Sequence, residues 1–318
     1  VYDVLGKAFP TAIQTRFSAY LDRHRLKREI IATQISNALI NEMGISFVSR
    51  LQDETGAPPA AIVRAYIVSR ALFDMDRVRH LINEPSSQID TKTQLLILQE
   101  ANRLVRRGTR WFIRNRRAGM NIAETITHFQ PLIHQVREII PGLLVGTARE
   151  TCEALRAYLE GAGIPKDSEL MRQTVIMGVM HSSLDIVETA ITHHLDIGLV
   201  VSVYFSVGDK LELSWFREQI KNRPVNNHWE ALARAAFRDD VDRQQSLLTV
   251  SIINFSETDT AKAGPLDKLD KLVEKWLKRH KRLIARWQFF VNELKTVAAP
   301  EFTMFSVVLR ELLDMGQT

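Results

Sequence analysis

The sequence predicts an all-α fold, a multi-helix bundle or short solenoid, and three observations support it. Apolar residues recur at spacings of three and four through most of the 318 residues, as on one face of a helix. Prolines and glycines mostly separate these periodic stretches. The one stretch that resembles a strand by composition, Leu199–Val207, matches a helical segment earlier in the chain.

Composition restricts the class of protein. The 45% apolar and 25% charged residues are ordinary values for a soluble globular protein. A formal charge of +5 is a small surplus and weak evidence for a nucleic-acid partner. The single cysteine, Cys152, excludes an internal disulfide framework and predicts a cytoplasmic location. No apolar run is long enough to span a bilayer and no signal peptide opens the chain, so no membrane partner is expected. Val1 predicts that the sequence begins inside a longer or processed protein.

The N-terminal part is expected to form short helices. Residues 1–22 contain a short amphipathic pattern after Pro10, and Arg25–Met43 continues as a second helix up to a break at Gly44. The expected buried side of that second helix consists of Ile30, Ile31, Ile35, Leu39 and Ile40. A further helix covers Ile45–Glu54. Pro58 and Pro59 then suit a helix start, where a missing N–H costs nothing, so helices are expected over Ala60–Leu72 and Asp74–Ile82.

The rest of the chain is organised around a long central helix, Gln94–Arg117. Its narrow apolar seam consists of Ile97, Ala101, Leu104, Gly108 and Trp111. An arginine stripe follows the same rhythm on its flank and consists of Arg103, Arg107, Arg110, Arg114 and Arg117. Because Gly108 lacks a side chain within the seam, a neighbouring backbone is expected to approach closely there.

Beyond the central helix, Asn121 is expected to cap the next helix, and Pro131, Pro141 and Gly142–Gly146 are expected to divide the chain up to about residue 160. Gly161–Pro165 is predicted as a loop and Phe255–Gly264 as a mobile connection. The expected helices are Glu169–Leu195, Gly198–Leu211, Leu213–Lys221, Trp229–Ile253, Leu266–Val297 and Glu301–Leu313. Leu266–Val297 carries an uninterrupted seam over roughly 48 Å at 1.5 Å per residue, which must pack along another long helix.

Two parts of the chain match at an offset of 138 residues. The offset pairs Tyr66 with Tyr204 and Arg79 with Arg217, and most other matched positions are apolar. It predicts a helical duplication, with related halves at about 24–130 and 166–254 around the central helix. Because Leu199–Val207 then corresponds to a helical segment that comes after a proline pair, it is predicted to be a helix.

Motifs for catalysis, cofactors and metals are weak, and we assign no catalytic, cofactor-binding or metal-binding residue. The nearest phosphate cradle, Gly161-Ala162-Gly163, lacks the third glycine and a preceding strand, so it is predicted as a loop. His193 and His194 are adjacent and would point apart on a helix. His280 is interpreted as a hydrogen-bonded packing residue, and Cys152 as a small buried side chain without an activating neighbour.

Two charged groups have alternative interpretations. The arginine stripe, together with the basic run 275–286, suits either a phosphate backbone or carboxylates on neighbouring helices. The abundance of acidic residues favours salt bridges between helices or domains. The acidic cluster of Asp239, Asp240 and Asp242 is interpreted as a surface patch or a helix N-terminal charge and not as a metal site.

Several segments resemble one enzyme family. Four segments are similar to the C-terminal helical region of the large bacterial NAD-specific glutamate dehydrogenases. They are Gln94–Arg117, Glu54-Thr55-Gly56-Ala57-Pro58, Arg64-Ala65-Tyr66 and the stretch from His24 to Thr33. The resemblance extends to about Leu313. It implies a parent enzyme that converts L-glutamate, NAD and water to 2-oxoglutarate, ammonia and NADH in a catalytic domain upstream.

The resemblance also implies a role for residues 1–318 as a C-terminal domain. That domain would pack against the catalytic domain of the same chain, assemble a homo-oligomer or transmit regulation, without binding NAD itself. Two alternatives from other classes remain at this point. One is a basic helical protein that binds nucleic acid through the arginine stripe, and the other is an independent helical-repeat adaptor.

Overall fold

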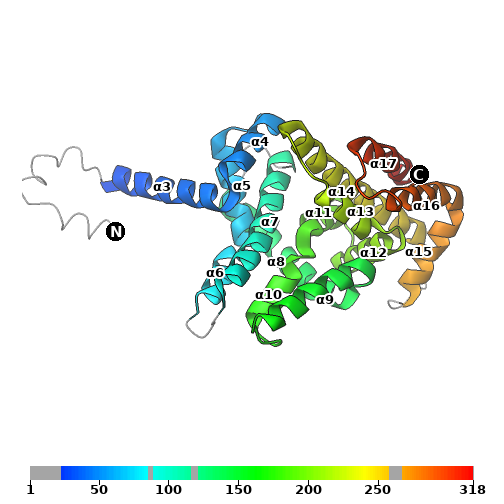
Figure 1. Ribbon diagram of the computed structural model, residues 1–318, viewed down its shortest axis with the longest axis horizontal. Coiled ribbons are helices and arrows are strands. Elements are labelled where there is room, and N and C mark those ends of the chain that lie inside the picture. The colour runs from blue at the N-terminus through cyan, green and yellow to red at the C-terminus, as the bar shows by residue number, and fades with distance from the viewer. Residues whose placement is uncertain (1–22, 85–88, 116–120, 258–266, 318) are drawn as a thin grey trace, which may run out of the picture.

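The computed structural model describes residues 23–84, 89–115, 121–257 and 267–317, and in these residues it contains only helices (Figure 1). Fifteen α-helices and two short 3-10 helices lie in the described part, which confirms the all-α prediction. The expected helix within residues 1–22 lies outside the described residues, as does Arg117 of the stripe. The connection expected over Phe255–Gly264 is helical up to Glu257, and its remainder lies outside the described residues.

The first part of the chain forms helices whose bounds agree closely with the predicted ones. They are α3 (Arg23–Met43), α4 (Ile45–Thr55), α5 (Pro59–Leu72), α6 (Met75–Ile82), α7 (Thr91–Asn115) and α8 (Ile122–Ile139). Pro59 occupies the first turn of α5, as predicted. The side chain of Asn121 caps α8 by accepting a hydrogen bond from the Glu124 amide at 3.3 Å, which confirms the predicted cap.

The second part continues with shorter helices. They are η1 (Ile140–Leu143), α9 (Gly146–Gly161), α10 (Glu169–Met177), η2 (Met180–Ser182), α11 (Ser183–His193) and α12 (Ile197–Lys210). The last five are α13 (Leu213–Asn222), α14 (His228–Glu257), α15 (Asp267–Arg279), α16 (Lys281–Lys295) and α17 (Phe302–Gly316). Because α12 contains Leu199–Val207, the predicted helix is confirmed there against the strand propensity of its β-branched residues.

Helices α4, α5 and α6 begin at the predicted offset from α11, α12 and α13. Helices α4 and α11, and likewise α5 and α12, begin and end 138 positions apart. The matched residues Asp74 and Glu212 both have left-handed backbone conformations, with φ of 51° and 53°, as do Gly56 and His194. We call α4–α7 the first half and α11–α14 the second half. These coincidences support the duplication, which stays a prediction.

Helix α8 lies between the halves, since it packs on α5 of the first half and on α11 and α12 of the second. The division predicted at Pro131 is wrong, because α8 continues through this residue. Pro131 is exposed, so water can replace the hydrogen bond that its missing N–H cannot make.

Helix α3 extends away from the body, as Figure 1 shows at the blue end of the chain. The predicted buried side of this helix is therefore wrong for most of its residues. Leu39 is buried near its end, but Ile31 and Ile40 are each 44% exposed. Its apolar periodicity is real, yet the described part of the chain covers only its C-terminal turns.

Two helices predicted as continuous are broken. Glu169–Leu195 is interrupted at Gly178, where α10 and the segment after it meet at a bend of 60°. Glycine stabilises a helix less than other residues do, which makes this position the favourable place for a break. Within the described residues no single helix has the length and apolarity to cross a membrane, although this bent pair together meets those criteria.

The seam of Leu266–Val297 is interrupted at His280, so the prediction of one 48 Å helix is wrong. The His280 ring lies 4.1 Å from the Trp276 ring, and its Nδ1 lies 3.0 Å from the Trp276 carbonyl oxygen. This side chain therefore competes with the backbone for a helical carbonyl. The break lets α15 pack on α12 while α16 packs on α17.

Candidate functional site

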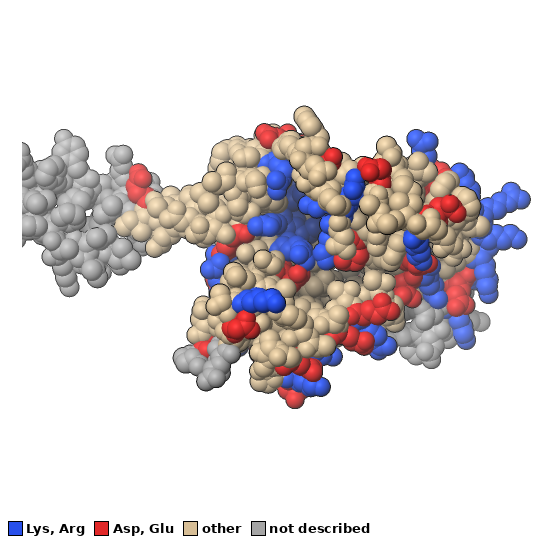
Figure 2. All heavy atoms as spheres, viewed as in Figure 1, with Lys and Arg blue, Asp and Glu red and all other residues tan. Residues whose placement is uncertain are grey.

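A hollow lined by basic side chains opens at the centre of the molecule, between α7 and α14 (Figure 2). The main cavity has a volume of about 750 Å³, and helices of both halves contribute to its wall. A smaller hollow of about 260 Å³ lies beside it. Arg107 of α7 lines both. The contacts of Arg107 therefore shape the walls of both hollows, because this side chain belongs to each of them.

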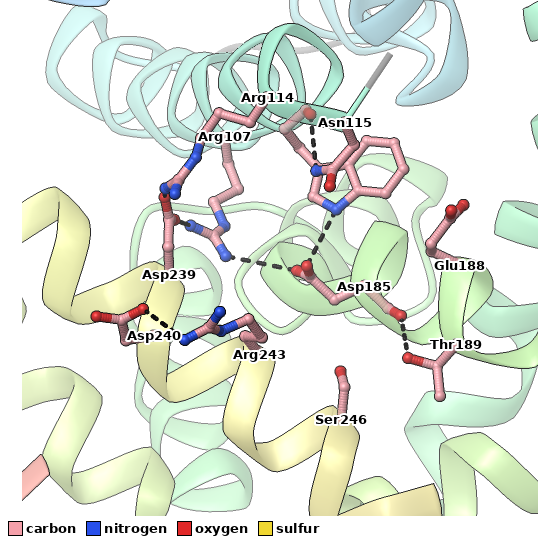
Figure 3. Close-up of a pocket in the computed structure, with 11 residues that line it drawn as sticks. Arg107, Arg114, Asn115, Asp185, Glu188, Thr189, Asp239, Asp240, Arg243 and Ser246 are labelled. Atoms are coloured by element: carbon pink, nitrogen blue, oxygen red, sulfur yellow. Dashed lines mark hydrogen bonds and ion pairs between the residues drawn. The ribbon is translucent and has the colours of Figure 1, made fainter. Parts of the chain in front are cut away.

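Arg107 is the centre of an ion-pair network that joins the halves (Figure 3). Its guanidinium donates to Asp239 and Asp242 of α14 and lies 3.4 Å from the Asp185 carboxylate of α11. Its Nε donates to the His181 carbonyl at 3.3 Å. With its side chain only 14% exposed, Arg107 needs these acceptors, because a buried charge without partners is costly.

Of the remaining described arginines of the stripe, Arg110 and Arg114 confirm the interpretation of salt bridges between helices. Arg110 pairs with Glu54 and, at 3.1 Å, with Asp239, and Arg114 also pairs with Asp239. Arg103 instead pairs within α7, with Glu100 at 2.6 Å. These arginines are therefore occupied by carboxylates of the same chain.

The interpretation of the acidic cluster as a surface patch is wrong. Asp242 is fully buried and Asp239 is 17% exposed, while Asp240 is partly exposed, at 39%. The cluster and the arginine stripe are partners, which sequence reasoning missed because Arg107 lies 132 and 135 positions before Asp239 and Asp242. The large number of carboxylates in the sequence indicated that the arginines have acidic partners, but it did not identify which carboxylates pair with Arg107.

Asp242 holds a second set of partners in addition to Arg107. Arg217 of α13 donates from Nε at 2.7 Å, and Ser182 donates from its hydroxyl at 3.2 Å. Arg217 is held in turn by the Tyr204 hydroxyl at 3.1 Å and by Gln245. Tyr204 and Arg217 are both identical to their counterparts at the 138-residue offset, so the matched positions of the second half stabilise this carboxylate.

The two buried carboxylates beside Arg107 have opposite pKa shifts. Burial raises the pKa of Asp242, but Arg107, Arg217 and Arg238 outweigh that effect and hold the pKa well below its ordinary value. Burial also raises the pKa of Asp185, to about 6, and Arg107 compensates only in part. The difference arises from the partners, because Asp242 contacts three cationic side chains and Asp185 shares one of them.

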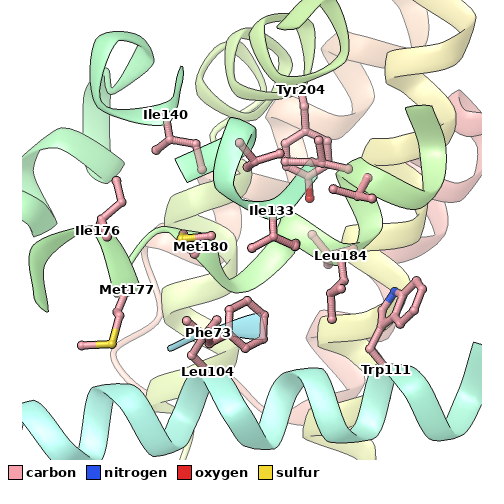
Figure 4. Close-up of a cluster of buried hydrophobic side chains, with 14 of the residues drawn as sticks. Phe73, Leu104, Trp111, Ile133, Ile140, Ile176, Met177, Met180, Leu184 and Tyr204 are labelled. Atoms are coloured by element: carbon pink, nitrogen blue, oxygen red, sulfur yellow. The ribbon is translucent and has the colours of Figure 1, made fainter. Parts of the chain in front are cut away.

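An apolar cluster packs between the helices that carry the network (Figure 4). Leu104 of α7, Ile133 of α8 and Leu184 of α11 lie in it together with Phe73 and Tyr204. Gly108 of α7 faces α5, where an added Cβ would come within 2.8 Å of the Phe73 ring. A neighbour does approach closely at Gly108, but the nearest atoms belong to the Phe73 and Ser69 side chains and not to the backbone that the sequence predicted.

The main cavity contains further basic side chains that sequence analysis did not single out. They are Arg50 of α4, Arg106 of α7, and Arg234 and Arg238 of α14. The signal present in the sequence was the spacing of four between Arg234 and Arg238, which places both on one face of a helix. The positions of Arg50 and Arg106 relative to that face depend on tertiary packing.

The residues that the sequence offered as possible sites lie apart from this cavity. Gly161 ends α9, and Gly163 has a φ of 85° in the predicted loop. His193 and His194 are exposed at the end of α11. Cys152 is buried, as predicted, and burial raises its pKa to about 11, which disfavours the reactive thiolate. Among the described residues, no group of three or more His, Cys, Asp and Glu side chains is placed to hold a metal ion.

The chemistry that this arrangement supports best is the binding of anions. Arginine presents five donors in a planar fork that matches carboxylates and phosphates. His181 lines the same cavity, and burial together with nearby Arg238 holds its pKa well below the ordinary value, so its imidazole is neutral at pH 7.

Comparison with known proteins identifies the relatives of this chain. Residues 1–314 match the family model described as glutamate dehydrogenase, C-terminal. The chain is 37% identical over 311 residues to the NAD-specific glutamate dehydrogenase of Pseudomonas aeruginosa and 36% identical over 313 residues to that of Halomonas elongata. The Mycobacterium tuberculosis enzyme of the same name is 24% identical over 314 residues. These matches cover 98–99% of this chain but only 19% of each relative.

Proposed function

Because the chain belongs to the family of glutamate dehydrogenase C-terminal regions, we propose that it is the C-terminal helical domain of an NAD-dependent glutamate dehydrogenase. The parent enzyme would convert L-glutamate, NAD and water to 2-oxoglutarate, ammonia and NADH in the cytoplasm. The domain would contribute assembly or regulation, while a catalytic domain of the same polypeptide carries out the reaction. The proposal rests on a sequence identity of 36–37% to NAD-specific glutamate dehydrogenases, which extends over 98% of the chain.

The helical architecture supports this division of labour. A dinucleotide fold holds its cofactor at the edge of a parallel sheet, whereas the described residues form helices only. The basic cavity supplies guanidinium donors for anions. The matched region also makes up only 19% of each relative, which leaves ample polypeptide for a catalytic domain.

The projecting helix α3 supports contact with the rest of such a polypeptide. Ile31 and Ile40 are each 44% exposed, and Ile45 at the start of α4 is 67% exposed. Exposed apolar side chains on a helix that projects from the body suit contact with another part of a longer polypeptide. We propose that α3 packs against the catalytic domain of the same chain, and that the whole enzyme is a homo-oligomer.

A substitution in the complete dehydrogenase tests this role. We expect Ile31→Asp with Ile40→Asp to lower the melting temperature of the complete enzyme and reduce its oligomer size in light scattering. The same pair in the 318-residue chain should leave its melting temperature unchanged, because both side chains are exposed there. Unchanged size and melting temperature of the complete enzyme would reject the packing role.

The assignment of the chemistry has its own test. Calorimetric titration of the 318-residue chain with NAD should give no binding in the micromolar range, and the chain should not reduce NAD with glutamate. Micromolar binding would place a cofactor site within these residues and overturn the division proposed above.

A further inference from the structure

The wall of the main cavity carries more positive charge than its own carboxylates neutralise. Several of its basic groups have partners: Arg103 pairs with Glu100, Lys221 pairs with Glu218 at 3.0 Å, and Arg107 belongs to the central network. The glutamates that line the cavity are thereby occupied. Any further cationic side chain in the wall must find its counter-charge elsewhere.

Three arginines of the wall have no carboxylate partner among the described residues. Arg106 donates to the Glu42 carbonyl at 3.2 Å, and Arg234 donates to the carbonyls of Lys221 and Arg223 at 3.4 and 3.3 Å. Arg50 is half-buried and makes no ion pair in the described part of the chain. Backbone carbonyls hold two of these guanidinium groups in place but leave their charge uncompensated.

The three unpaired arginines lie close enough to influence one another. Burial lowers the pKa of Arg106, and the nearby Arg50 and Arg103 lower it further. Burial also lowers the pKa of Arg234, again with a contribution from Arg50. Arg50 is therefore near both of the others. Like charges gathered in one concave site favour a ligand of opposite charge, because the surrounding low-dielectric walls strengthen the attraction.

The shape and lining of the cavity favour a small molecule. Its volume of about 750 Å³ is within the range of ligand sites, and Phe47, Leu155 and Phe205 contribute apolar wall beside the arginines. An anion with a carbon skeleton would contact both kinds of surface. Figure 2 shows the hollow as a depression lined with blue basic side chains.

We propose that this cavity binds a small organic polyanion, with two or more phosphate or carboxylate groups held by Arg50, Arg106 and Arg234. Because Arg50 and Arg106 belong to the first half and Arg234 to the second, the ligand bridges the halves. Its binding then stabilises their relative position. A molecule that binds the folded chain raises the melting temperature as its occupancy increases.

Calorimetric titration of the 318-residue chain with inorganic pyrophosphate and, separately, with citrate tests the proposal. The two probes distinguish phosphate from carboxylate as the recognised group. We expect at least one of them to bind with a dissociation constant below about 1 mM and to raise the melting temperature. Changing Arg106→Gln with Arg234→Gln should weaken that binding about ten-fold or more, because each lost charge-assisted hydrogen bond contributes substantially.

A matched control separates recognition from bulk charge. Arg282→Gln with Arg310→Gln removes the same charge from two exposed positions outside the cavity and should change the affinity less than about two-fold. If the cavity pair fails to fold, Arg50→Gln alone provides the test, since its side chain makes no ion pair with a described residue. Absence of binding by both probes at about 5 mM, or equal weakening in the control pair, would overturn the proposal.

Discussion

The two matching halves each place a tyrosine and an arginine around one buried carboxylate, but in different surroundings. Near the first half, Glu42 accepts from the Tyr66 hydroxyl at 2.6 Å and pairs with Arg70 and Arg79. In the second half, Asp242 pairs with Arg217, which the Tyr204 hydroxyl contacts. The tyrosine and the arginine occupy matched positions in the two halves. The carboxylate does not, because Glu42 belongs to α3 and Asp242 to α14.

The arginine side chains of the two clusters differ in their exposure to solvent. The Arg70 and Arg79 side chains are 23% and 41% exposed, so water shares their solvation. The Arg107 and Arg217 side chains are only 14% and 9% exposed. The same pairing of a tyrosine and an arginine with a carboxylate therefore forms a partly exposed cluster near the first half. In the second half it belongs to a buried network that connects the two halves.

The largest effect is expected from Asp242→Asn. This change leaves Arg107 and Arg217 buried with less counter-charge, and we expect it to reduce the free energy of unfolding by about 3–5 kcal/mol in urea denaturation. Asp240→Asn is the matched control, because Asp240 is 39% exposed and lies 3.6 Å from Arg243. The control should change stability by less than about 0.5 kcal/mol. Equal losses in the two variants would show that burial does not set the cost.

A smaller loss is expected from Glu42→Gln. Its arginine partners remain partly solvated, so we expect a loss of about 1.5–3 kcal/mol, the usual range for hydrogen bonds to charged groups. Comparing urea denaturation of this variant with that of Asp242→Asn tests the difference between the clusters. A loss as large as that of the Asp242 variant would remove the distinction drawn between them.

The helix crossings of the halves can be compared through two glycines. At Gly108 an added Cβ would meet Phe73 and Ser69 at 2.8 Å, and we expect Gly108→Ala to cost about 1–3 kcal/mol in thermal or urea unfolding. Gly208 of α12 faces the side-chain amide of Gln245 at 2.7 Å. Because that amide is the end of a longer side chain that can shift, Gly208→Ala should cost less. The reverse order would mean that the second crossing is the tighter one.

The smallest expected effect is a pH dependence that arises from Asp185. Its pKa is raised to about 6 in the folded chain, so the folded state binds the proton more strongly than the unfolded state does. The associated stability is fully present below the ordinary aspartate pKa of 3.8 and is lost as pH rises through about 6. We expect Asp185→Asn to remove about 1 kcal/mol of the stability difference between pH 5 and pH 8, measured by urea denaturation at each pH. An unchanged difference would show that Asp185 ionises without cost.

Local patterns predicted most helices, because period, proline position and capping are encoded within a few residues. The 138-residue offset predicted even Leu199–Val207 as a helix. The breaks at Gly178 and His280 were not predicted, since the apolar period continues through both and the deviation depends on what each side packs against. The exposure of Ile31 and Ile40 was missed because a periodic pattern shows that a helix has an apolar face but not what covers it.

The candidate site depended on tertiary contacts even more strongly. The arginine stripe was predicted to form salt bridges, but its partners Asp239 and Asp242 were interpreted as a surface patch. The cavity arginines Arg50 and Arg234 lie on helices distant in sequence, and only packing brings them together. Spacing along one helix is visible in a sequence, whereas convergence of two helices is not.

The network at Arg107 also has a consequence for the order of folding. Arg107 contacts residues 132 and 135 positions later, whereas Glu42 contacts Tyr66 and Arg70 only 24 and 28 positions away. Short loops close more readily, so the first half is expected to fold while the rest of the chain is still being synthesised. At roughly 5–20 residues per second, Arg107 then remains without its carboxylates for on the order of ten seconds. During that interval the nascent domain presents the unpaired Arg107 to the ribosome and its surroundings.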